Sequence, residues 1–341
     1  MKKFFVAIMV VAILVSAVAF TACTPEDSIP NVDKTYTLVA PDGAPALAIA
    51  DLITQIPTDK AVYGISRKVV SSSIISTEAI KSDVDMAIVP ANLGARIFNS
   101  SGGYKILAVV TNGNLYMTSS ISCEVNSLQD LKGQMVYSIG QSSVPDMIFK
   151  TLLTNAGIEY VVSEEAVAGK VAIKYYADGS EVISQLALAK SENKLAFGIY
   201  GEPAVTTSFT KGFEQVFDLQ KLWAEIDESS QSGYAQAVLI ARDSVCEDSE
   251  FVTKLLYALK ANENSIMVDS AKAVANIKAI YPQSALQANV TMDVIERCNI
   301  KTVATNTSAG REYYENTLKA VMAINANLIG GKLPSDDFYL E

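Results

Sequence analysis

The stretch Met135–Pro145, MVYSIGQSSVP, decides the fold class of this chain. Met135–Ile139 is a short apolar run of the kind that forms a buried strand. Gly140 then lets the chain turn tightly, and Pro145 stands where a helix begins, because proline suits the first helical turn. A strand that passes through a glycine turn directly into a helix predicts an α/β layer structure.

The same arrangement, a strand followed by a glycine turn and a proline at a helix start, occurs twice more. Tyr36–Ala40 runs into Pro41–Pro45 (PDGAP), and Leu195–Tyr200 runs into Gly201–Pro203 (GEP). In open α/β sheets, ligands bind beside the carboxyl ends of strands, where helix N-termini present free N–H groups. Each loop alone also fits a plain strand-to-helix connection, but the recurrence in separate parts of the chain favours a binding site.

Other segments extend this pattern. Further apolar, β-branched runs predict strands at Val84–Val89, Ile106–Val110, Val171–Tyr175 and Ala235–Ala241. Several lack strict alternation, which is typical of largely parallel sheets covered on both faces. The spacing in Pro45–Gln55 predicts a helix, and the segment from Glu247 to Ile329 is predicted to be mainly helical, with Gly330 ending its last helix.

Small and polar residues that follow the predicted strands form a candidate ligand-binding site. They are Asp42, Gly43, Ala44, Ser71, Ser72, Asn92, Asn112, Gln141, Ser142, Ser143, Asp178, Tyr200 and Glu202. Helix capping is the alternative role for the serine run and for Asp178. For Ser143 a capping role beside ligand binding is also open.

The charges in these loops bear on the solute. Asp42, Asp178 and Glu202 lie in them, whereas Lys and Arg do not. Carboxylates near an anion cost Coulomb energy, so a neutral or cationic organic solute is favoured, for example a small heterocycle that stacks on Tyr116 or Tyr200. Paired carboxylates also suggest glycoside hydrolysis, but the sequence offers no aromatic platform or second acid motif for it.

Composition excludes several function classes. The 341 residues contain 27 Lys+Arg, 37 Asp+Glu and no histidine, for a net charge of −10. Ser-His-Asp, Cys-His and His-metal sites are therefore impossible, and no catalytic residue, metal or cofactor is expected. The acidic balance argues against nucleic acid as a partner.

The first residues are typical of an export signal. Met1–Lys3 is basic and Phe4–Phe20 is apolar. Phe20–Cys23 (FTAC) resembles the bacterial lipoprotein cleavage box, with Phe20 where leucine is usual. We expect a signal peptide over residues 1–22, lipid on Cys23, and a polar tether over residues 23–34. An ordinary signal peptide with an incidental cysteine is the alternative.

The remaining cysteines are Cys123, Cys246 and Cys298, and none lies in a C-x-x-C spacing. Three thiols cannot all pair. Small buried side chains are the favoured reading over a disulfide or a reactive thiol.

Four further motifs support a family resemblance. They are Val84–Asn92 (VDMAIVPAN), Ser127–Gly133 (SLQDLKG), Gly201–Val205 (GEPAV) and Gly330–Pro334 (GGKLP) followed by Phe338-Tyr339. From about Tyr36 to the C-terminus the chain resembles the bacterial ABC-importer extracytoplasmic solute-binding lipoproteins of the nitrate/sulfonate/taurine and thiamine-pyrimidine type.

The resemblance implies a two-lobed type II periplasmic-binding fold. Residues 35–112 would form the first part of lobe 1, residues 113–233 lobe 2, and residues 234–341 the mostly helical second part of lobe 1, with the helical C-terminal tail packing on the first lobe. The polar segments Thr111–Asn114 and Ser232–Tyr234 would be the two hinge crossovers, ordinary polar turns being the alternative.

The implied function is delivery of a small solute to an ABC permease by cleft closure. The protein would be a monomer anchored by Cys23 acyl chains on the extracytoplasmic face of the cell membrane. A ligand sensor for a membrane receptor, or an enzyme on the same fold, are the alternatives. Against the enzyme alternative, the chemistry of the family's pyrimidine-synthase relatives relies on histidine, and this chain has no histidine.

Overall fold

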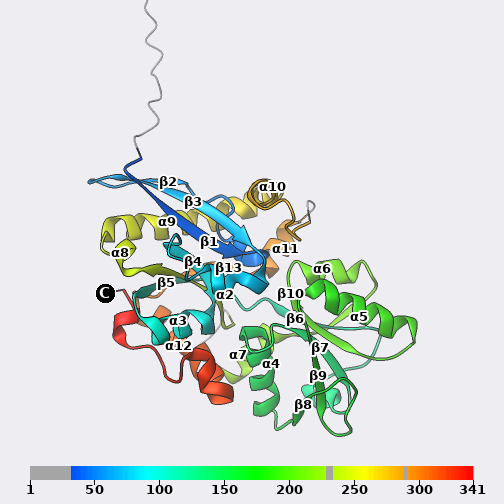
Figure 1. The fold of residues 1–341 in the computed structure, drawn as a ribbon. Helices are drawn as coiled ribbons and strands as arrows, with labels where there is room; N and C mark the ends of the chain where they lie inside the picture. Colours follow the sequence, from blue (N-terminus) through cyan, green and yellow to red (C-terminus); the bar gives the residue numbers. More distant parts are fainter. Residues whose placement is uncertain (1–31, 228–232, 288–289, 341) are drawn as a thin grey trace, which may run out of the picture. The chain divides into compact units, whose positions relative to one another are not determined.

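The computed structural model describes residues 32–227, 233–287 and 290–340. Its strands form two sheets, one of seven strands in the order β13-β5-β12-β4-β1-β3-β2 and one of six in the order β11-β6-β10-β7-β9-β8 (Figure 1). The first sheet contains β1 Lys34–Pro41, β2 Gln55–Pro57, β3 Val62–Val70, β4 Met86–Pro90, β5 Tyr104–Asn112, β12 Ala235–Arg242 and β13 Ile300–Ala304. The second contains β6 Leu115–Ser119, β7 Met135–Ile139, β8 Tyr160–Val162, β9 Val171–Tyr176, β10 Phe197–Gly201 and β11 Glu214–Asp218.

Helices cover both faces of the first sheet. They are α1 Ala44–Leu47, α2 Ile75–Glu78, α3 Ala91–Ser101, α8 Asp243–Cys246, α9 Ser249–Val268, α10 Ser270–Ile280, α11 Met292–Arg297 and α12 Ser308–Asn325. Successive strand residues enter opposite cores: Ile88 is buried in the cluster that includes α9 and α10, and Val89 in the cluster that includes α3 and α12. Burial on both faces explains why these strands lack an alternating pattern.

The second sheet is also covered on both faces, by α4 Val144–Asn155, α5 Gly179–Ser191, α6 Ala204–Phe209 and α7 Leu219–Ile226. Ile148 and Trp223 bring α4 and α7 into the core that is shared with the first sheet. Val182 and Val205 bring α5 and α6 into a separate cluster with Tyr116 and Tyr200. The α/β fold class is therefore confirmed, and each sheet with its helices makes one lobe.

The tail is more complex than a set of helices on one lobe. Its residues Ile300–Ala304 form β13, which pairs antiparallel with β5 at the edge of the first sheet. Helix α12 packs on α3 of the first lobe and also on α4 of the second. Both sheets are mixed, because β12, β5, β13 and β2 of the first and β6 and β11 of the second pair antiparallel.

The predicted helix Pro45–Gln55 is wrong beyond Leu47. In a continuing helix the N–H of Asp51 would bond to the carbonyl of Leu47. Instead the Asn262 amide of α9 takes both groups: its Nδ2 donates to Leu47 O at 3.1 Å, and its Oδ1 accepts from Asp51 N at 2.7 Å. A tertiary contact thus replaces the helical hydrogen bond.

Candidate functional site at the carboxyl ends of the strands

Two of the predicted loops lie side by side in the first lobe. Strands β1 and β3 are parallel neighbours that end together at Pro41 and Val70. The Ser72 hydroxyl donates to the carbonyl of Asp42 at 3.5 Å, which joins the two loops. Gly43 adopts φ +99°, and a Cβ there would meet nothing within 4 Å, so the main chain at Gly43 borders open space.

The other predicted groups of these loops are hydrogen-bonded or buried. The Asp42 carboxylate accepts from Ser284 Oγ at 2.6 Å and from Ala285 N at 2.8 Å, which ties the loop after α10 to the end of β1. Ser71 accepts from Ser73 N at 3.4 Å and caps the short 3₁₀ turn Ser72–Ile74. Ala44 is buried.

In the second lobe the predicted loop follows β7. Gln141 and Ser142 are exposed, and Ser142 adopts the left-handed φ of +63°. The Ser143 hydroxyl donates to Gly140 O at 2.7 Å and makes no hydrogen bond to the helix that it precedes, so its predicted capping contact is wrong.

A buried carboxylate that sequence reasoning missed holds this loop. Asp146 lies in the first turn of α4, and its Oδ2 accepts from Ser142 N at 2.9 Å. Its Oδ1 pairs with Lys150 Nζ at 2.9 Å and accepts from the Tyr175 hydroxyl at 2.5 Å. Burial, followed by the hydrogen bond to Asp146, raises the pKa of Tyr175 far above its usual value. This group fixes the main chain at Ser142.

Three more predicted residues lie after β9 and at the end of β10. Asp178 is exposed and accepts from Ser180 N and Glu181 N at 2.8 and 3.1 Å, so it caps α5. Tyr200 is fully buried, which raises its pKa, and its hydroxyl meets Thr118 Oγ1. Glu202 is buried, and both of its oxygens accept from Thr206 of α6.

Glu202 also makes an ion pair that crosses between the lobes. Arg297, the last residue of α11, places Nε 2.8 Å from Glu202 Oε1, although its N–H is not aligned for a hydrogen bond. Burial raises the pKa of Glu202, and the backbone hydrogen bond from Thr206 and the Arg297 charge act in the opposite direction. The Arg297 guanidinium lies 4.3 Å from the centre of the Tyr116 ring.

The two chain crossovers between the lobes are hydrogen-bonded to each other. Gly113 N donates to Tyr234 O at 2.8 Å. Asn112 is buried, and its amide nitrogen donates to the carbonyls of Asn299 and Lys301 while its oxygen accepts from the Tyr313 hydroxyl. The predicted crossover residue Ser232 lies outside the described residues, as do Cys23 and the segment before Val32.

Asn92, predicted at the end of β4, turns toward the tail. Its Nδ2 donates to Leu328 O at 3.4 Å, and its buried Oδ1 has no hydrogen-bond partner among the described residues. The structure thus places the thirteen predicted residues at the carboxyl ends of strands and at the helix starts that follow them, in both lobes. The members that border solvent include Gly43, Ser71, Ser72, Gln141, Ser142 and Asp178.

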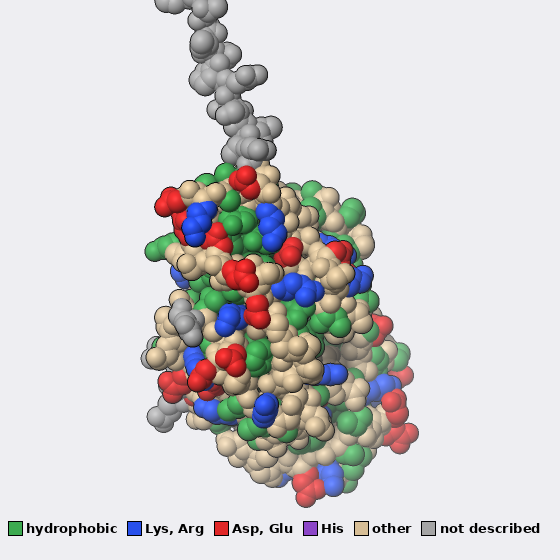
Figure 2. All heavy atoms as spheres, turned by 60° about the vertical axis from the view of Figure 1, so that its left-hand side comes forward, with side chains coloured by type: hydrophobic (Ala, Val, Ile, Leu, Met, Phe, Trp, Pro, Cys, Tyr) green, Lys and Arg blue, Asp and Glu red, His purple; other side chains and the backbone are tan. Residues whose placement is uncertain are grey.

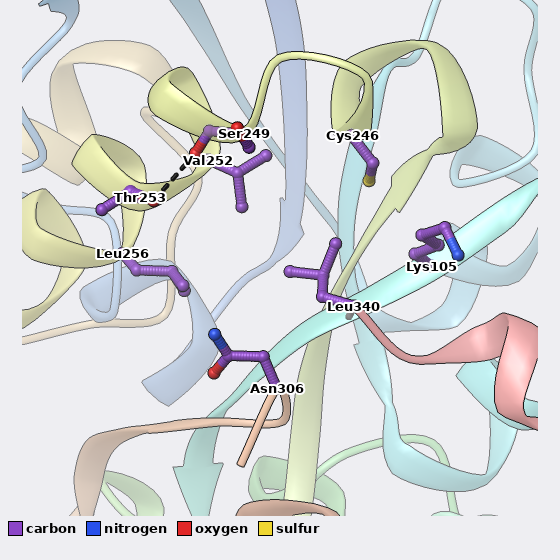
Figure 3. A pocket seen from close by; sticks show the side chains of 8 residues that line it. All are labelled: Lys105, Cys246, Ser249, Val252, Thr253, Leu256, Asn306 and Leu340. Carbon is purple, nitrogen blue, oxygen red and sulfur yellow. Dashed lines mark hydrogen bonds between the residues drawn. The ribbon is translucent and has the colours of Figure 1, made fainter.

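A hollow of about 420 Å³ lies apart from the predicted site residues. Lys105, Cys246, Ser249, Val252, Thr253, Leu256, Asn306 and Leu340 line it (Figure 3). Lys105 is seven residues from Asn112 along β5, so at ~3.3 Å per residue the hollow is roughly 23 Å from the crossover. None of the thirteen predicted residues lines it, and we do not assign the solute site there.

The described ranges contain no group of three His, Cys, Asp or Glu side chains placed to hold a metal ion. Within the same ranges, no helix has the length and apolarity to span a membrane. Lys and Arg alternate with Asp and Glu on the face drawn in Figure 2, without a continuous basic patch. Cys123, Cys246 and Cys298 are unpaired.

The fold is that of the two-lobed periplasmic-binding proteins, and the solved structures similar to it include an ABC transporter protein and a periplasmic sulphonate binding protein. An ABC transporter protein from Parabacteroides distasonis is 18% identical, with a TM-score of 0.71 over 91% of this chain and 99% of its own. The periplasmic aliphatic sulphonate binding protein SsuA from Escherichia coli is 12% identical, with a TM-score of 0.63 over 89% and 90%.

The ligand-binding component of an ABC-type import system from Staphylococcus aureus, solved with zinc bound, is 14% identical, with a TM-score of 0.56 over 90% of this chain and 96% of its own. No protein-family model matches the chain. No curated protein matches it either.

Proposed function

We propose that this chain is an extracytoplasmic solute-binding protein that delivers a small molecule to an ABC importer. One observation carries the proposal: loops at the carboxyl ends of strands in two lobes, joined by two adjacent crossovers, in a fold shared with ABC-transporter substrate-binding proteins. Such lobes close around a ligand, so that binding shifts an open–closed equilibrium.

The contacts within the loops support recognition by main-chain N–H groups and hydroxyls. Asp42, Asp178 and Glu202 already accept hydrogen bonds from protein donors. Of the three, Glu202 is paired with a cation, Arg297. The hydrogen bonds to Asp42 and Asp178 come from neutral donors and leave their negative charge in place, so the electrostatic preference for a neutral or cationic solute remains. The exposed side chains of Ser72, Gln141 and Ser142 offer both donors and acceptors, and they suit a small polar solute.

The organisation of the chain belongs to the same proposal. Residues 35–112 and 234–341 form the first lobe and residues 113–233 the second. Cys23 carries lipid after removal of residues 1–22, and residues 23–34 tether a monomeric protein to the extracytoplasmic face of the membrane. A single acyl chain anchors weakly, so stable attachment requires the two or more chains of a lipoprotein cysteine.

A thermal-shift screen of the purified full chain tests the proposal. Sulfonates, nitrate, pyrimidines and amino acids are the probes, and each is also tested for chemical change. A single site at 100 times Kd adds about 2.7 kcal/mol to the free energy of unfolding. A saturable shift without turnover supports the proposal. Turnover of any probe contradicts it.

A further inference from the structure

Arg297 belongs to the first lobe by its position in the chain but makes its side-chain contacts in the second. Its Nη2 donates to Gln215 Oε1 of β11 at 3.0 Å, and its Nε pairs with Glu202 after β10. The guanidinium lies 4.3 Å from the ring centre of Tyr116 on β6 and 5.2 Å from that of Phe209 on α6. Three elements of the second lobe and the loop after β10 therefore form one receptor for this cation.

The receptor suits a guanidinium. The Glu202 side chain is completely buried, whereas the Arg297 side chain is 30% exposed. A buried carboxylate is costly unless a cation and hydrogen-bond donors compensate it. A planar guanidinium can pair with a carboxylate, donate to an amide oxygen and stack on aromatic rings at the same time, which an ammonium group cannot.

The main chain beside Arg297 is fixed to the crossover. Tyr116 donates its hydroxyl hydrogen bond to Arg297 O at 3.3 Å. Two residues later, Asn299 donates from Nδ2 to Gly113 O at 2.9 Å, and its carbonyl accepts from Asn112 N at 3.0 Å. The Arg297 side chain thus extends from a point anchored at the hinge into the other lobe.

We propose that Arg297 is a positioning residue that adds a non-covalent connection between the lobes, beside the packing of α12 on α4, and holds the second lobe in the described orientation. This inference rests on the proposed function in one respect only: the two lobes must move relative to each other. Rotation of the second lobe about the Gly113–Tyr234 crossovers carries the receptor away from Arg297. The free energy of these contacts therefore favours the described orientation over more open ones.

The test is small-angle X-ray scattering of the full chain and its variants, without added solute. Arg297→Gln removes the charge. We expect the ratio of molecules in more open orientations to molecules in the described orientation to rise about 5- to 30-fold, the equivalent of 1–2 kcal/mol. The radius of gyration should increase accordingly. Arg297→Lys should be intermediate, because it restores charge without the planar geometry.

Arg311→Gln is the matched control. Arg311 also pairs with two carboxylates, Glu315 and Asp336, and lies 4.1 Å from the Tyr339 ring centre, but all these partners belong to the first lobe. Its loss should lower stability without changing the scattering profile.

A double-mutant cycle with Glu202→Gln gives a second readout from chemical denaturation. We expect Arg297→Gln to cost less in the Glu202→Gln background than in the wild type. Scattering of Arg297→Gln no different from Arg311→Gln, together with additive effects in the cycle, overturns the proposal. Neither measurement uses a solute, so this inference can fail while the solute-binding function stands, and the reverse.

Discussion

The main-chain N–H of Gly113 donates a 2.8 Å hydrogen bond to the carbonyl of Tyr234, which places the two crossovers between the lobes side by side. Gln220 of α7 connects the two crossovers further, because its Oε1 accepts from Leu115 N at 2.8 Å and from the Tyr234 hydroxyl at 3.0 Å. Both crossovers therefore pass between the lobes at one place in the molecule.

Gly113→Ala should destabilise the protein. An added Cβ would lie 2.8 Å from the Gln220 side chain and 2.8 Å from the Tyr234 ring, both of which are held by hydrogen bonds. Overpacking of this kind costs typically 1–3 kcal/mol. Chemical denaturation measures the loss, and Gln220→Ala in the same chain should recover part of it. A Gly113→Ala protein within about 0.5 kcal/mol of wild type contradicts this account of the hinge.

Asp146→Asn should be among the most damaging single changes. The variant leaves Lys150, which is 14% exposed, without its carboxylate, and breaking a buried ion pair costs about 3–5 kcal/mol. Asp146→Asn with Lys150→Met should recover stability, because no uncompensated charge remains. Glu159→Gln is the control, since its pair with Lys170 is exposed and should contribute little. Equal Tm values for Asp146→Asn and Glu159→Gln would refute the prediction.

The contribution of Glu202 to stability should depend on pH with a definite sign. Burial raises its folded-state pKa above the usual 4.5, so folding favours the protonated form. The stability that Glu202 contributes is therefore present below pH 4.5 and is lost as the pH rises through the folded-state pKa. We expect the Tm difference between wild type and Glu202→Gln to fall between pH 4 and pH 7. A difference that grows with pH would mean that the Arg297 charge outweighs burial.

Cys23→Ser should release the protein from membranes. The basis is the cleavage-box sequence, since Cys23 lies outside the described residues. Without acyl chains the chain loses its proposed anchor. Fractionation and mass spectrometry of the N-terminus measure this, with Cys123→Ser as the cysteine control. Membrane retention of Cys23→Ser equal to that of wild type would rule out the lipoprotein assignment.

Local sequence predicted the elements whose character is set locally. The strand Met135–Ile139 is correct to the residue, because an apolar β-branched run ends at a glycine with φ +69° and a helix-starting turn. The strand Ile300–Ala304 was missed, although Ile300, Thr302 and Val303 favour strands, because it lies within a segment predicted to be mainly helical. It becomes a strand through pairing with β5.

The candidate site shows the same division. Loops at strand ends were found from glycine and proline positions, but the partners of their charged groups come from distant segments. Asp42 bonds to Ser284 and Glu202 pairs with Arg297, and neither partner lies near its acid in the sequence. Asp146 and Lys150 have a recognisable i,i+4 spacing, yet only burial makes that pair important. Solute contact by the thirteen predicted residues stays a prediction.

Native mass spectrometry of the full chain purified in mild detergent tests the central claim most directly. We predict one small molecule bound per protein, and roughly 5- to 150-fold weaker binding in Ser72→Ala and in Ser142→Gly, because each loses one hydroxyl that can hydrogen-bond to the solute. Ser142→Gly suits the left-handed φ of +63° and should keep its stability. Ser191→Ala, whose hydroxyl donates to Leu188 O on α5, is the control. A bound molecule retained equally by both loop variants would contradict a solute site shared by the two lobes.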